Sequence, residues 1–137
     1  MEIQDLYASS ARLVRGIDTN FKRYLYDAID WNVRMLCIRG AKGVGKTTMM
    51  LQYIKEHFPK TSSALYVTLD DLWFSNNRLI DLVDYHYSHG GTHLFIDEVH
   101  RYPFLSWSTE LKNAYDKYPS LHIVFSGSSL LQLNQST

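Results

Sequence analysis

The sequence contains only one cysteine, Cys37, and only three prolines among its 137 residues. A single cysteine cannot form an internal disulfide, so packing must stabilise the fold, and the composition fits a reducing compartment. Cys37 lies within an apolar run, where a cysteine is a small core residue and not a nucleophile.

Long apolar runs are also missing, since none reaches the length of about 20 residues that a membrane-spanning helix needs. The first five residues are acidic and lack the apolar segment of a signal peptide. The sequence therefore predicts a cytoplasmic protein with no membrane partner.

The sequence has no excess of charge, because fourteen basic residues balance fourteen acidic ones. No overall field draws such a protein to nucleic acid or to an anionic membrane. Nucleic acid is not indicated as a partner, and binding it would require a local basic patch.

Residues 40–48 are the most informative stretch, because they follow an apolar run and read G-x-x-x-x-G-K-T. This is a phosphate-binding P-loop, or Walker A motif, in which glycines let successive N–H groups turn toward a phosphate chain. Lys46 supplies a charge for the β- and γ-phosphates of ATP, and Thr47 supplies a hydroxyl for Mg²⁺. The residues that we expect to contact the nucleotide are Gly40, Ala41, Lys42, Gly43, Val44, Gly45, Lys46, Thr47 and Thr48.

Apolar runs alternate with helical patterns along the chain, which predicts an α/β fold with a mostly parallel sheet. The expected strands are 33–38, 64–69, 92–98 and 121–125. The expected helices are 2–15, one from about 19 to 30, 48–57, 77–89 and 107–118. The second of these helices is predicted from one apolar face, formed by Phe21, Tyr24, Leu25, Ala28 and Ile29, with Asp18 or Thr19 as its N-cap.

Asp97 and Glu98 come directly after an apolar strand, which is the Walker B pattern. Ligands of an open α/β sheet bind at the carboxyl ends of the strands, where the P-loop also lies. Asp97 is therefore expected to hold Mg²⁺ opposite Thr47, and Glu98 to orient or deprotonate the attacking water. Another carboxylate pair, 70–71, is either a metal site or, more simply, a helix cap.

A glutamate directly after the Walker B aspartate marks the additional-strand catalytic-glutamate class of P-loop ATPases. In that class a further strand lies between the Walker A and Walker B strands and carries a polar sensor residue at its tip. Ser126 and Ser128 follow the last expected strand and are the candidates for this sensor. The alternative is that they cap the next helix.

Three stretches, 40–48, 94–112 and 124–131, together resemble the AAA-type ATPase domain of a widespread set of bacterial and archaeal proteins. In those proteins the P-loop module precedes a C-terminal domain of unknown function. The family usually has Arg-Gln where this chain has Lys42-Gly43. The resemblance implies a three-layer P-loop fold that binds ATP with Mg²⁺ and hydrolyses it.

The resemblance also implies a fifth strand, an arginine-bearing segment and a C-terminal domain beyond residue 137. We therefore expect an N-terminal piece of a longer protein, with a helical segment at 1–32 that packs on a P-loop ATPase core at 33–137. Its sheet would be incomplete on the C-terminal side, and its ATP hydrolysis weak or absent. The missing strand would leave 33–38 as an edge, a site for dimerisation or homo-oligomer formation.

Other functions remain as alternatives. Residues 97–100 spell the D-E-x-H of helicases, yet Lys46 and Asp97 are only about fifty residues apart, and the basic balance is weak for a nucleic-acid track. A GTPase would need an N-K-x-D motif, which the sequence lacks. A small-molecule kinase and a non-catalytic nucleotide-sensing module stay open. Three histidines, at 86, 89 and 93, are poorly spaced for a metal site because glycines separate them.

Overall fold

Four parallel strands form one sheet within the residues that the structure, a computed structural model, describes: 1–40, 45–60 and 62–127. The strands are β1 (Met35–Arg39), β2 (Ala64–Thr68), β3 (His93–Asp97) and β4 (His122–Gly127). Their order is β1-β4-β3-β2 and every pairing is parallel. The last strand is thus inserted between the strand before the P-loop and the strand that ends on Asp97, which confirms the predicted additional-strand α/β fold.

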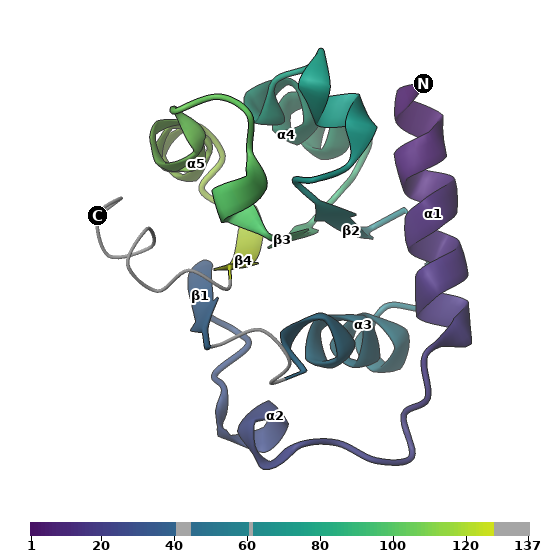
Figure 1. Cartoon of the computed structure of the whole chain (residues 1–137). Helices are drawn as coiled ribbons and strands as arrows, with labels where there is room; N and C mark the ends of the chain where they lie inside the picture. The colour runs from purple at the N-terminus through teal and green to yellow at the C-terminus, as the bar shows by residue number, and fades with distance from the viewer. Residues whose placement is uncertain (41–44, 61, 128–137) are drawn as a thin grey trace.

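In the part of the chain that the structure describes, five α-helices and two short 3-10 helices surround this sheet. They are α1 (Ile3–Gly16), α2 (Tyr24–Ala28), α3 (Lys46–His57), η1 (Leu72–Ser75), α4 (Leu79–Ser88), η2 (Val99–Arg101) and α5 (Trp107–Lys117). Figure 1 shows α3 on one side of the sheet, α4 and α5 on the other, and α1 standing beside β2. The arrangement is a three-layer α/β/α fold.

Both faces of the sheet are apolar, as strands buried between two helical layers require. Successive residues point to opposite faces, so that Leu94 and Ile96 pack toward α4 and α5, whereas Phe95 packs toward α3. Met49 and Met50 of α3 are fully buried against this second face. Helices therefore cover both faces of the sheet, and loops lie at the carboxyl ends of its strands.

Helix α1 covers the side of β2. Leu6 belongs to the core under α4 and α5, and Val14 to the core under α3, so the helix spans the edge of the sheet. The hydroxyl of Ser10 accepts a hydrogen bond of 2.9 Å from the backbone N–H of Tyr66, which gives the edge strand a partner that no neighbouring strand supplies.

The predicted helix from about 19 to 30 is wrong in its length and in its buried face. Helix α2 has only five residues, and Phe21 and Tyr24 are 73% and 87% exposed, while Tyr26 is buried. The reason is that the side-chain amide of Gln52 donates to the carbonyl oxygens of Asp18, at 2.9 Å, and Phe21, at 2.7 Å. These two bonds fasten the segment 18–21 to α3 in a conformation that is not helical.

The other predicted elements are present, with ends that differ by a few residues. The pair 70–71 is a cap, because the carboxylate of Asp71 accepts a hydrogen bond of 3.0 Å from the N–H of Trp73 at the start of η1. The predicted apolar face of the helix after it is confirmed: Leu79, Leu82, Val83 and His86 are all buried.

Candidate functional site

The two described ends of the P-loop meet beside the carboxyl end of β1. Lys46, the first residue of α3, is buried, and its ammonium group donates a hydrogen bond of 2.7 Å to the carbonyl oxygen of Gly40. Gly45 has φ +85°, in the left-handed region that favours glycine, and a Cβ there would lie 2.5 Å from Nε of Arg23. Four predicted contact residues, Ala41, Lys42, Gly43 and Val44, lie outside the described residues, whereas Thr48 lies exposed in the first turn of α3.

Thr47 and Asp97, the residues predicted to share a magnesium ion, are in direct contact. The hydroxyl of Thr47, in the first turn of α3, donates a hydrogen bond to Oδ2 of Asp97, the last residue of β3. Asp97 is only 2% exposed. The fold therefore brings together two residues that lie fifty positions apart in the sequence.

Three more donors surround the Asp97 carboxylate. The hydroxyl of Ser126 donates to Oδ1 at 2.6 Å, the hydroxyl of Tyr66 donates to Oδ2 at 2.7 Å, and the N–H of Glu98 donates to Oδ1 at 3.0 Å. A buried carboxylate is costly unless hydrogen bonds replace its water, and this one has donors on both oxygens. Burial, together with the neighbouring Asp97 carboxylate, raises the pKa of the Tyr66 phenol, so this hydroxyl remains a donor.

Tyr66 is a site residue that sequence reasoning missed. It lies in β2 among aliphatic residues, where it reads as one more core residue. The available signal was its hydroxyl, because a buried tyrosine needs a polar partner for that end of its ring.

Of the two candidate sensor residues, the structure describes Ser126 alone, because Ser128 lies outside the described residues. Ser126 lies at the end of β4, fully buried, and its hydroxyl faces Asp97. Its role as a sensor stays a prediction.

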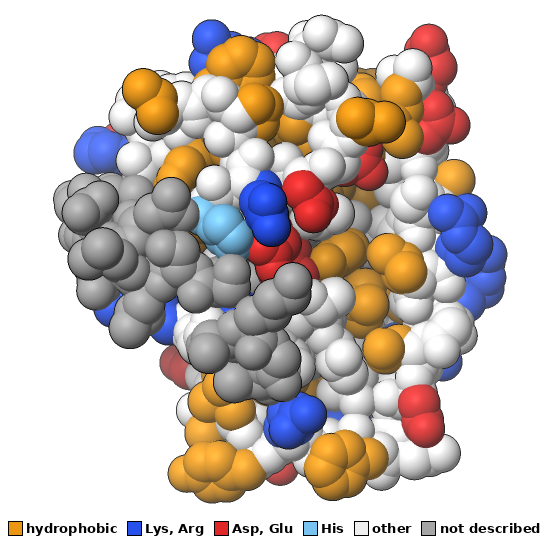
Figure 2. All heavy atoms as spheres, in the orientation of Figure 1, with side chains coloured by type: hydrophobic (Ala, Val, Ile, Leu, Met, Phe, Trp, Pro, Cys, Tyr) orange, Lys and Arg blue, Asp and Glu red, His pale blue; other side chains and the backbone are white. Residues whose placement is uncertain are grey.

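Glu98 follows Asp97 at the junction between β3 and η2. Its φ is +55°, an uncommon value for a residue other than glycine, and its carboxylate Oε2 lies 3.0 Å from Nε2 of His100 in η2. A Cβ on Gly127 would lie 3.0 Å from Nδ1 of His100, so η2 packs closely on the tip of β4. In Figure 2, acidic, basic and histidine side chains gather near the centre of this face.

The histidines at 86, 89 and 93 have other roles. His86 is fully buried: its Nδ1 lies 2.7 Å from the hydroxyl of Tyr7, and its Nε2 lies 2.8 Å from the carbonyl oxygen of His93. A carbonyl oxygen only accepts, so Nε2 carries the proton and Nδ1 accepts from Tyr7. The described residues contain no group of three metal-ligating side chains from His, Cys, Asp and Glu.

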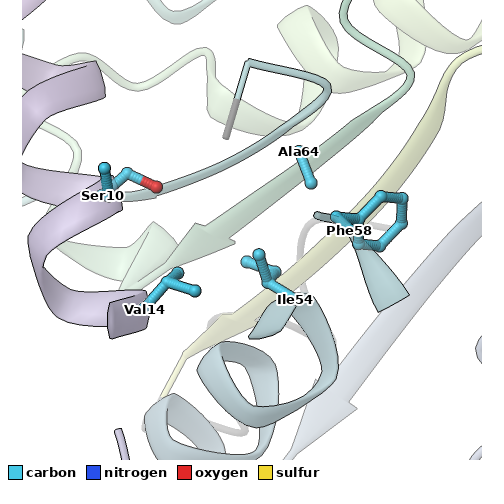
Figure 3. A pocket seen from close by; sticks show the side chains of 6 residues that line it. Ser10, Val14, Ile54, Phe58 and Ala64 are labelled. Carbon is cyan, nitrogen blue, oxygen red and sulfur yellow. The ribbon is translucent and has the colours of Figure 1, made fainter. Parts of the chain in front are cut away.

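A small apolar pocket lies between α1, α3 and β2, away from these residues (Figure 3). Its lining includes Ser10, Val14, Ile54, Phe58 and Ala64, and its volume is about 10 Å³. That is barely the space of one water molecule. It is a packing defect and not a ligand site. Across the described ranges, no helix is long and apolar enough to cross a membrane.

The chain is similar to known proteins in sequence and in fold. A family model described as an AAA domain matches residues 32–137. Comparison with curated proteins gives no significant match.

Two solved structures share the fold. One, of C. elegans PCH-2, has a TM-score of 0.52 and 14% sequence identity, and the match covers 98% of this chain and 39% of that one. The other, from a study of katanin self-assembly, has a TM-score of 0.53 and 17% identity, with 99% and 49% covered. This chain thus spans less than half the length of either. With its parallel sheet and the meeting of Thr47 with Asp97, the chain belongs to the AAA domain family and is an ATP-binding domain of the AAA type.

Proposed function

We propose that this chain binds ATP together with Mg²⁺ at the carboxyl end of its sheet, and that the longer protein hydrolyses the bound ATP. The contact between the Thr47 hydroxyl and the Asp97 carboxylate carries this proposal, because it joins the Walker A and Walker B residues in one place. The two side chains come from different elements, α3 and β3, and meet only through the fold.

The side chains present fit a magnesium ion. Mg²⁺ takes oxygen ligands and is usually held by one or two carboxylates together with the phosphates of the substrate. Thr47 and Asp97 supply a hydroxyl and a carboxylate side by side. Thr47 would ligate the ion, and Asp97 would hold it through water. When bound, the ion neutralises charge on the β- and γ-phosphates.

The start of α3 fits the phosphate chain. This helix of twelve residues begins after Gly45, which has no side chain to cap the first N–H groups. Free amide groups and the positive end of the helix dipole form an anion-binding site. Lys46 lies in the same turn, and its ammonium group would move from the carbonyl of Gly40 to the β- and γ-phosphates.

Glu98 is the proposed general base. Its carboxylate lies next to Asp97 in the chain and is partly exposed, so a water molecule can reach it. It would accept a proton from the water that attacks the γ-phosphate. Family members of this class supply an arginine from elsewhere, and such a residue is worth roughly 10³–10⁵ in rate. We therefore propose slow turnover for residues 1–137 alone.

Calorimetric titration with ATP and Mg²⁺ tests the proposal. Lys46→Ala should lose measurable binding, whereas Glu98→Gln should bind ATP and lose turnover. Lys112→Ala is the matched control, since this exposed lysine pairs only with Asp116 on the far helix α5 among the contacts described. Equal binding by Lys46→Ala and the unaltered chain would refute the assignment.

A phosphate-release assay on the same proteins separates the alternatives. Release of phosphate without any added acceptor supports a hydrolase, whereas transfer only to an added metabolite supports a kinase. Binding without turnover, also in a form extended past residue 137, supports a nucleotide-sensing module. The helicase alternative has no support in the family match.

A further inference from the structure

We propose that Tyr66 and Ser126 act as a clamp that positions the Asp97 carboxylate for Mg²⁺, and that Tyr66 is a positioning residue of this site. The inference rests on the proposed function, since it concerns the same metal site. Neither hydroxyl is assigned to the metal or to the nucleotide in this proposal. Each acts through Asp97.

The sheet places these two hydroxyls on opposite sides of the carboxylate. Strand β3 lies between β4 and β2, and each neighbour contributes one donor. Ser126 from β4 donates to Oδ1 at 2.6 Å, and Tyr66 from β2 donates to Oδ2 at 2.7 Å. One donor on each oxygen fixes both the position and the plane of the carboxylate.

The register of the sheet explains how Tyr66 reaches Asp97. Tyr66 pairs with Phe95, and residues two apart in a strand point to the same face. Asp97 therefore lies on the face that carries Tyr66 and Phe95, under the start of α3. A tyrosine side chain is long enough to bring its hydroxyl from β2 to the carboxylate of Asp97. A shorter hydroxyl side chain at this position would not reach that carboxylate.

An aspartate needs such a clamp because rotation of its carboxylate about the last side-chain bond is weakly restrained by rotamer preference. The third side-chain donor, Thr47, is exposed and belongs to helix α3, outside the sheet. Tyr66 and Ser126 belong to the same sheet as Asp97 and are almost completely buried. They hold the carboxylate whether or not a ligand is present.

Two substitutions remove the clamp with little change in shape. Tyr66→Phe deletes only the hydroxyl and keeps the ring that packs under α3. Ser126→Ala deletes the donor to the other oxygen. The matched control is Tyr26→Phe, because the hydroxyl of Tyr26 also donates to a carboxylate at 2.7 Å, that of Glu56 at the other end of α3. The control loses the same type of bond away from the site.

The experiment measures the affinity for a fluorescent ADP analogue, once with excess Mg²⁺ and once with EDTA. The ratio of the two dissociation constants reports how much Mg²⁺ strengthens binding. ADP lacks the γ-phosphate, so a sensor role of Ser126 toward that phosphate does not enter the measurement. Thermal unfolding without ligand shows whether each variant is folded.

We expect the Mg²⁺ enhancement to fall about tenfold in Tyr66→Phe and in Ser126→Ala, the effect typical of residues that orient a metal ligand. The affinity in EDTA should stay unchanged in both variants, and Tyr26→Phe should change neither value. If Tyr66→Phe does not fold, Ser126→Ala tests the clamp, because the proposal requires one sheet donor on each oxygen of Asp97.

If Mg²⁺ strengthens binding as much in a folded variant as in the unaltered chain, the clamp is overturned, whereas the proposed function is not affected. A loss of affinity in EDTA as large as the loss in Mg²⁺ would overturn it too, since that indicates general damage to the site. If the unaltered chain binds no nucleotide, the proposed function itself fails.

Discussion

The carboxylate of Glu98 lies 3.0 Å from Nε2 of His100, two residues further along the chain. The backbone of Glu98 is itself in the left-handed region, at φ +55°. Strained backbone of this kind persists only where the surrounding structure holds it, and it occurs often at functional sites. Glu98 is thus fixed through both its main chain and its side chain.

We predict that His100→Ala lowers kcat for ATP hydrolysis by about tenfold, because a misplaced catalytic group loses rate more than it loses binding. KM for ATP should stay the same. His100→Gln retains an N–H donor near the carboxylate and should recover part of the rate. Steady-state kinetics on a form of the protein that hydrolyses ATP measure both constants. A raised KM with an unaltered kcat would show that His100 serves binding and not the position of Glu98.

Gly45→Ala should both weaken nucleotide binding and lower the free energy of unfolding by roughly 1–2 kcal/mol, the cost of a left-handed conformation for a residue with a Cβ. The added carbon would also meet the Arg23 side chain, which must then move. Urea unfolding and calorimetry measure the two effects. The double variant Gly45→Ala/Arg23→Ala separates strain from contact, since full recovery of stability in it would contradict the backbone explanation.

Gly91→Ala should destabilise the fold by roughly 1–3 kcal/mol, the usual cost of overpacking. A Cβ at Gly91 would lie 2.3 Å from the buried ring of His86, which is fixed by its two hydrogen bonds. Gly16→Ala is the control, because nothing lies within 4 Å of a Cβ at that helix end. Equal urea midpoints for the two variants would mean that the His86 ring moves freely aside.

Stability should fall as the pH falls from about 6.5 toward 4. Burial, together with the nearby His122 and His86, lowers the pKa of His93 to about 4 from its usual 6.5. Within this window the unfolded chain binds a proton that the folded chain does not, so acid favours unfolding. Burial lowers the pKa of His86 as well and adds to the effect.

His93→Gln removes one of these titrating groups. Urea unfolding at several pH values between 7.5 and 4 should therefore show a shallower loss of stability in the variant than in the unaltered chain. Some loss should remain because His86 still titrates. Parallel curves for the two proteins would contradict the assignment to His93.

The meeting of Thr47 with Asp97 was predictable from the sequence, because two local motifs and the rule for parallel strands suffice for it. The incorrect prediction that Phe21 and Tyr24 lie on the buried face of a helix has an equally definite cause. Their spacing fits a helix, but the carbonyl groups nearby are engaged by Gln52, a residue of another element, and local spacing contains no information about that contact.

Tyr66 and His100 illustrate the same limit at the site. Tyr66 reaches Asp97 only because β2 pairs with β3 in the register that puts Tyr66 beside Phe95. His100 reaches Glu98 only because Glu98 adopts a left-handed conformation and η2 packs on Gly127. Motifs identify the residues that perform the chemistry, whereas the residues that hold them in place depend on tertiary geometry.

The central position of β4 has a consequence for synthesis on the ribosome. Strands β1 and β3 do not pair with each other, and each pairs with β4 instead. When translation has passed Asp97, both halves of the site exist, but the strand that pairs with both β1 and β3 does not. The sheet of the nascent chain therefore cannot join β1 to β3 until β4 has been synthesised, and ATP binding should arise only after that late step.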